Sequence, residues 1–224
     1  MKDCHAIDIC KQYPKGCSEY CIGYIQMKNI YILSNMPKRY QKEMKLTDPG
    51  PDLKAFKFLK EFQENVVEKV DEGAGLFLYS ERKGNGKTSW ACKITNEYFR
   101  KVALSNNLKC RGLFVSVPEF LQDLRKEISN PTQHMERMVE NIETADMVIW
   151  DDIGSEKPSD WVRERLYTYI NHRESRGKTQ IYTSNISLDE LADDRYLGER
   201  IASRINGQCH IIEFKGIDRR GDWK

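Results

Sequence analysis

The stretch Leu76–Thr88, LFLYSERKGNGKT, decides the fold of this chain. Its apolar beginning predicts a short buried strand, and the glycine-rich turn that follows ends in Gly86-Lys87-Thr88, where a helix is expected to begin. Backbone N–H groups and the positive end of a helix meet in such a turn, which favours binding of phosphate groups. The residues expected to contact a bound nucleotide here are Gly84, Asn85, Gly86, Lys87, Thr88 and Ser89.

Two side chains of this loop have expected roles. Lys87 would reach the β- and γ-phosphates of ATP, and the Thr88 hydroxyl would ligate Mg²⁺. The pattern also asks for a glycine five residues before Gly86, where this chain has Glu81. A carboxylate inside the loop would repel phosphate, so we expect the Glu81 side chain to face solvent.

A second predicted strand ends in two carboxylates. The segment Met147–Asp152, MVIWDD, places Asp151 after four apolar residues. Asp151 is the expected second magnesium residue, and Asp152 stands where a carboxylate can polarise an attacking water. Because Asp is shorter than the more frequent Glu, hydrolysis at this site is expected to be slow.

Polar residues follow two later elements. Asn185 ends the predicted strand 180–185, where it would sense the γ-phosphate or position water; the alternative is that Asn185 or Ser187 caps the next helix. Arg200 and Arg204 lie one helical turn apart, so they share a face. An arginine at such a position can contact and stabilise the γ-phosphate bound by a neighbouring subunit. A solvent-exposed surface arginine fits the pattern equally.

Around these motifs the chain alternates short apolar strands with helices, which is typical of a parallel sheet covered on both faces. The sequence predicts a five-stranded α/β domain at 52–224, a linker at 36–51 with proline, glycine and charge, and a module at 1–35. Strands are expected at 76–80, 113–117, 147–151, 180–185 and 210–214. The main helices are expected at 53–70, 88–104, 118–129, 132–143, 159–175 and 188–206.

The composition is that of a globular protein. Of 224 residues, 39% are hydrophobic and 31% charged, which excludes collagen-like and wholly disordered chains. No run approaches the roughly 18 apolar residues of a membrane helix, and the first ten residues, MKDCHAIDIC, lack the apolar centre of a signal peptide, so a cytoplasmic location without membrane contact is expected. The net charge of +2 says little about binding partners, so any surface for nucleic acid must be a local basic patch.

Four of the seven cysteines lie within the first 21 residues. Without an export signal, an odd number of cysteines argues against a disulfide framework. Four thiolates suffice for tetrahedral zinc, which would supply folding energy that so short a segment lacks. We therefore expect Zn²⁺ at Cys4, Cys10, Cys17 and Cys21, with His5 as a spare ligand; reduced free thiols are the alternative.

The motifs together resemble those of AAA+ ATPases of the bacterial and phage replicative-helicase loader type, the DnaC/DnaI-like family. The likeness runs from about residue 36 to the C-terminus. It is carried by ERKGNGKTS at 81–89, VIWDDIGSE at 148–156, WVRERL at 161–166, TSN at 183–185, GERIASRI at 198–205 and FKGIDRR at 214–220. The resemblance implies a truncated AAA+ (ASCE) module without the full helical lid. It also implies that Arg204 is an arginine finger and Arg220 a second sensor, with Arg219 as the substitute.

The resemblance further implies a function. Subunits bound to ATP would assemble and hold a hexameric replicative helicase on single-stranded DNA, and hydrolysis would release them. The region 118–143, between the second and third strands, corresponds to an element that faces DNA in related proteins, and residues 1–35 would grip the helicase. The basic candidates for DNA contact are Arg125, Lys126, His134 and Arg137, and the candidate anchors for the helicase are Tyr20, Tyr24 and Tyr31.

Three alternatives remain open. A transposition-helper ATPase of the IstB type has similar core motifs and would bind duplex DNA, although the N-terminal cysteines argue against it. A non-catalytic nucleotide-gated adaptor or helicase inhibitor is compatible with Glu81 and Asp152. A small-molecule kinase fits least, because it needs an acceptor pocket and lid.

Overall fold

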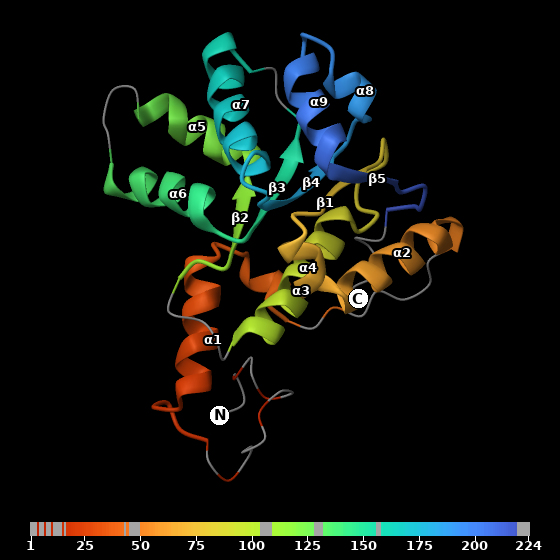
Figure 1. Ribbon diagram of the computed structural model, residues 1–224. Helices are drawn as coiled ribbons and strands as arrows, with labels where there is room; N and C mark the ends of the chain where they lie inside the picture. Colours follow the sequence, from red (N-terminus) through yellow and green to blue (C-terminus); the bar gives the residue numbers. More distant parts are fainter. Residues whose placement is uncertain are drawn as a thin grey trace.

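A five-stranded parallel sheet forms the centre of the molecule (Figure 1). The computed structural model describes residues 4, 7, 10, 15, 17–42, 44, 50–103, 109–127, 132–155 and 158–218. The strands are β1 (Gly75–Tyr79), β2 (Gly112–Ser116), β3 (Met147–Ile153), β4 (Thr179–Ser184) and β5 (Cys209–Glu213), in the spatial order β2-β3-β4-β1-β5. The expected five-stranded parallel sheet is thus confirmed.

Helices cover both faces of the sheet, as Figure 1 shows. One layer contains α1 (Ile22–Leu33), α2 (Leu53–Glu64), α3 (Val66–Asp71) and α4 (Lys87–Val102). The opposite layer contains α5 (Val117–Glu127), α6 (Gln133–Thr144), α7 (Asp160–Glu174), α8 (Leu188–Leu191) and α9 (Glu199–Gln208). Two short 3-10 turns, η2 (Lys38–Tyr40) and η3 (Gly50–Asp52), precede α2.

The alternating direction of the side chains along β1 explains why helices cover both faces of the sheet. Leu76 and Leu78 are fully buried in the core beneath α2, α3 and α4, whereas Phe77 is fully buried in the core beneath α5 to α9. Side chains of a strand point alternately to the two faces, so a strand covered on both sides is apolar along most of its length. β1, β2 and β3 therefore read as short apolar runs, whereas β4 also buries the polar side chains of Thr179, Gln180 and Thr183.

The structure divides two of the expected helices. The predicted helix 53–70 ends at Glu64 and restarts at Val66, because Asn65 leaves helical geometry with a φ of −103° and a ψ of 21°, and its side-chain amide donates to the Glu61 carbonyl over 3.1 Å. The predicted helix 188–206 is interrupted before Gly198, whose φ of 83° interrupts helical geometry.

The second half of α1 packs on the main domain. Met27 and Ile30 are buried in the same core as α4, and the Tyr31 hydroxyl donates to Asn96 of α4 over 3.1 Å. The segment after α1 then meets the free edge of β2, where the Phe114 N–H donates to the Ser34 carbonyl over 2.7 Å. Residues 22–36 thereby extend the helical layer rather than standing apart from it.

Across the described ranges, no helix combines the length and apolarity that a bilayer span requires.

Candidate nucleotide-binding site

The two carboxylates at the end of β3 sit in an irregular stretch of strand. The pairing of β3 with β4 shifts register between Trp150 and Ile153, and Asp152 has a φ of 60°. Positive φ is uncommon for a residue other than glycine, and β-bulges often re-aim side chains beside active sites. The bulge lets both carboxylates reach polar side chains at the end of β4: Asp151 contacts Thr183, and Asp152 contacts Asn185, the residue that follows the strand.

Asp151 is hydrogen-bonded from two sides. Its Oδ1 accepts the hydroxyl of Thr88, at the start of α4, and the hydroxyl of Thr183, in β4, each over 2.7 Å. Burial raises the pKa of Asp151 above its ordinary value, and the hydroxyls of Thr183 and Thr88 partly offset this effect. The predicted pair of magnesium residues is therefore brought together, and its hydroxyl and carboxylate oxygens are the hard ligands that Mg²⁺ prefers.

Asp152 and Asn185 form a second pair. The Asn185 amide donates to Asp152 Oδ1 over 2.5 Å, and the Asp152 N–H donates to the Thr183 hydroxyl over 2.9 Å. The capping role falls to Ser187, whose hydroxyl accepts the N–H of Glu190 at the start of α8. Asn185 therefore does not cap α8. Its side-chain amide instead orients the carboxylate of Asp152, the group predicted to act on water.

The phosphate loop joins β1 to α4. Gly84 and Gly86 have φ values of 75° and 96°, a conformation that glycine adopts without strain. Lys87 is 7% exposed, and its Nζ donates to the Arg82 carbonyl and to Asn85 Oδ1, each over 3.2 Å. Ser89 lies in the first turn of α4, and Glu81 is exposed, as expected.

The segment after β5 lies along this loop. The Ser80 hydroxyl donates to the Phe214 carbonyl over 2.6 Å, and the Asn85 amide donates to Ser80 Oγ over 2.6 Å. The buried carboxylate of Asp52, just before α2, accepts the backbone N–H groups of Lys215 and Gly216. Three parts of the chain that are distant in sequence therefore meet here: Asp52, the phosphate loop, and the segment 214–216 after β5. The sequence did not reveal these contacts.

Arg204 and Arg200 project from α9 toward α7. Arg204 pairs with Glu174 over 3.2 Å, and the Arg200 guanidinium stacks on the Tyr167 ring, 4.2 Å from its centroid. Hydrogen bonds from Arg204 and Arg200 lower the pKa of Tyr167. The shared face predicted for the two arginines is present, whereas Arg219 and Arg220 lie outside the described residues.

The predicted zinc site is not supported. Cys4, Cys10, Cys17 and Cys21 are all described, as half-buried free thiols. Within the described residues, no three histidine, cysteine or carboxylate side chains gather closely enough to hold a metal ion. Spacing alone does not bring thiols together, and Cys4 packs instead against the core beneath α4. His5 lies outside the described part of the chain.

The three candidate tyrosines differ in exposure. Tyr20 is 80% exposed, Tyr24 is half-buried, and Tyr31 is buried, with its ring edge-on to Phe99. Burial removes Tyr31 from any contact surface of the folded domain. The basic candidates on α5 and α6 are exposed, and Lys126 pairs with Asp123 over 2.8 Å.

Thr183 is a residue of the candidate site that sequence reasoning missed. The motif TSN at 183–185 drew attention to Asn185, yet Thr183 contacts both Asp151 and the backbone of Asp152. Its signal was a hydroxyl residue at the end of the strand beside β3, which could be recognised only once the strand order was known.

Comparison with known proteins agrees with this geometry. Residues 63–222 match the family model described as IstB-like ATP binding protein. The replicative helicase loader DnaI of Bacillus subtilis is 31% identical over 166 residues, 74% of this chain and 50% of the relative. The loader DnaC of Escherichia coli K12 is 23% identical over 142 residues, 62% of this chain and 53% of the relative.

The chain thus spans about half the length of these two relatives. Among solved structures, that of the DnaC helicase loader superposes with a TM-score of 0.65 at 24% identity, covering 80% of this chain and all of that one. This likeness shows the fold. The similarity to DnaC and DnaI read from the motifs is confirmed, and the chain belongs to the family of IstB-like ATP-binding proteins.

Proposed function

We propose that this protein binds and hydrolyses ATP between the phosphate loop and the end of β3. The observation that carries the proposal is the shared Asp151 oxygen, which accepts the hydroxyls of Thr88 and Thr183. Thr88 and Asp151 would hold Mg²⁺, which supplies positive charge against the phosphates when bound. Asp152, oriented by the Asn185 amide, would take the proton of the attacking water.

We further propose that the ATPase acts as a replicative helicase loader. DnaI and DnaC, to which the chain is similar over the ATPase domain, are themselves named replicative helicase loaders. In this reading the helicase contacts residues 1–35, where Tyr20 is the exposed aromatic candidate. Exposed basic residues on α5 and α6, such as Arg137, would contact the backbone of single-stranded DNA.

A transposition-helper ATPase is the second candidate, because the matching family model is the IstB-like one. Co-purification separates the two. A loader should retain a replicative helicase in an ATP-dependent manner and bind it less well in Tyr20→Ala, a change at an exposed residue that leaves the core contacts of Met27 and Ile30 in place. Retention of duplex DNA and a transposase instead, with no helicase bound, would favour the helper. ATP binding without hydrolysis, even with helicase and single-stranded DNA present, would leave only the non-catalytic adaptor or inhibitor.

Lys87→Ala should weaken nucleotide binding strongly. The Lys87 ammonium group is buried beside the loop that would hold the phosphates, so its removal deletes the main positive charge there. We expect the affinity for ATP to fall by roughly 100-fold, the loss of a strong charge-assisted contact. Titration with a fluorescent ATP analogue measures this change.

The control for that experiment is Lys101→Ala, at the opposite end of α4, where the lysine contacts the Glu64 carbonyl and Glu97. Its affinity for ATP should equal that of the parent protein. Equal affinity in Lys87→Ala would place the nucleotide elsewhere.

Arg204→Ala tests the proposed assembly. If Arg204 reaches the nucleotide of a neighbouring subunit, its truncation should leave ATP binding intact and lower hydrolysis by the assembled protein at least tenfold. Glu174→Gln, which removes only the ion pair within the subunit, is the matched control and should keep most of the activity. A loss of ATP binding in Arg204→Ala would show that Arg204 acts within its own subunit.

A further inference from the structure

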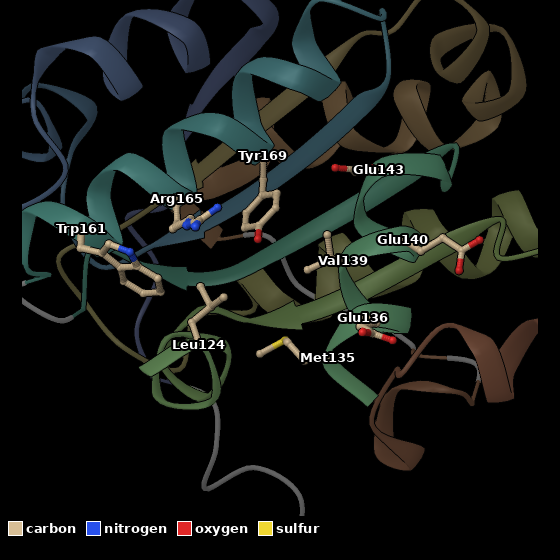
Figure 2. Close-up of a pocket in the computed structure, with 9 residues that line it drawn as sticks. All are labelled: Leu124, Met135, Glu136, Val139, Glu140, Glu143, Trp161, Arg165 and Tyr169. Carbon is tan, nitrogen blue, oxygen red and sulfur yellow. The ribbon is translucent and has the colours of Figure 1, made fainter. Parts of the chain in front are cut away.

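A groove lies between α5, α6 and α7, among helices that cover the sheet opposite α4 (Figure 2). Its cavity volume is about 670 Å³, which lies within the range of roughly 300–1,000 Å³ typical of ligand-binding pockets. In Figure 2 the side chains of Trp161 and Tyr169 point from α7 toward Leu124 of α5 and Val139 of α6. Met135 completes the apolar surface. This lining suits aliphatic or aromatic side chains.

One wall of the groove is acidic. Glu136, Glu140 and Glu143 line it from α6 at positions i, i+4 and i+7, which places them in one stripe about 10 Å long. Among the ion pairs of the described residues, none involves any of these three carboxylates. Arg165 is the one cation among the described residues of the lining, and its guanidinium lies over the Trp161 ring, 5.4 Å from the ring centroid. The groove therefore combines an apolar floor with unneutralised negative charge along one side.

This combination selects the class of occupant. Nucleic acid is disfavoured, because phosphates would face three carboxylates. The basic residues of α6, His134 and Arg137, are not part of the lining. A helix with apolar residues at i, i+3, i+4 and i+7 and lysine or arginine beside them matches both the floor and the acidic wall. Met135 is flexible and can adapt to the shape of such a guest.

We propose that this groove binds a basic amphipathic helix of a partner protein, lying alongside α6. Its apolar residues enter between Trp161 and Val139, and its cations meet Glu136, Glu140 and Glu143. The inference is independent of the proposed loader activity, because none of the lining residues belongs to the nucleotide site.

The test uses a fluorescein-labelled model peptide of about 14 residues, four helical turns, with leucine along one face and lysine beside it. Fluorescence anisotropy should show saturable binding that weakens with salt. The triple variant Glu136→Gln, Glu140→Gln, Glu143→Gln should weaken binding at least about tenfold. Glu164→Gln, an exposed change on α7 outside the lining, should not alter it. The same peptide with glutamate in place of lysine should fail to bind.

A spectroscopic measurement locates the peptide. In a protein with ¹³C-methyl methionine, the peptide should shift the signal of Met135, on the groove floor, and leave that of Met27, in the opposite core, unchanged. Three results would overturn the proposal: equal binding of the lysine and glutamate peptides, unchanged peptide affinity in the triple variant, or no shift of the Met135 signal. A shift of Met135 by single-stranded oligothymidine would assign the groove to DNA instead.

Discussion

Asp152→Asn should stop ATP hydrolysis while leaving ATP binding nearly intact. Asparagine has the same shape as aspartate and tolerates the positive φ of this position, so the bulge in β3 should survive the change. Its amide cannot accept the proton of an attacking water. Removal of a positioned general base lowers kcat by about 10²- to 10⁴-fold, and we expect a loss in this range. The affinity for ATP should change by less than about threefold, because the lost interaction forms only in the transition state.

Single-turnover release of phosphate measures the rate, and a fluorescent ATP analogue measures the affinity. Asp189→Asn is the matched control, because it makes the same change at an exposed residue of α8. Asn185→Ala should lower the rate less than Asp152→Asn does, since it removes only the group that orients Asp152. If Asp152→Asn kept a rate within about fivefold of the parent protein, another group would have to activate the water.

The strands could be predicted closely because each depends on a local pattern. Runs such as Leu76–Leu78 and Met147–Trp150 are buried on both faces of the sheet, which favours apolar residues throughout each run. The phosphate loop was equally local, since glycine, lysine and threonine act there within a single turn. Asp151 followed from its place at the end of such a run.

What could not be predicted depends on contacts across the sheet. Strict alternation would send Asp151 and Asp152 to opposite faces, and only the bulge against β4 gives both of them polar partners there. Thr183 matters because β4 lies beside β3, a neighbourhood set by the whole topology. The N-terminal cysteines show the opposite error. Their spacing in the sequence suggested a zinc site, but within the described residues their side chains do not gather as a metal-binding group.

Arg173 is a second residue whose role the sequence concealed. An arginine near the end of a helix normally reads as a surface residue, yet this side chain is fully buried. Its guanidinium donates to the carbonyl oxygens of Ile142 and Ala145 over 2.6 and 2.9 Å, and to that of Thr179 over 2.8 Å. It thereby joins the end of α6 to the starts of β3 and β4. Burial lowers its pKa to about 10, which still leaves it charged near neutral pH.

Arg173→Met should therefore destabilise the domain strongly. Methionine fills much of the same space, but three buried carbonyl groups lose their donors, and one of them belongs to the last turn of α6, where no helical partner exists. We expect a loss of about 3–5 kcal/mol in the free energy of unfolding, because each buried carbonyl left without a donor costs about 1–3 kcal/mol. Urea unfolding followed by circular dichroism measures this loss.

Arg176→Met, an exposed change three residues away, should alter the stability by less than about 0.5 kcal/mol. Arg173→Lys, which keeps the charge but cannot reach all the carbonyls, should fall between the two. Equal stability of Arg173→Met and Arg176→Met would mean that the carbonyls find other donors, and that α6 and the sheet are held together by apolar packing alone.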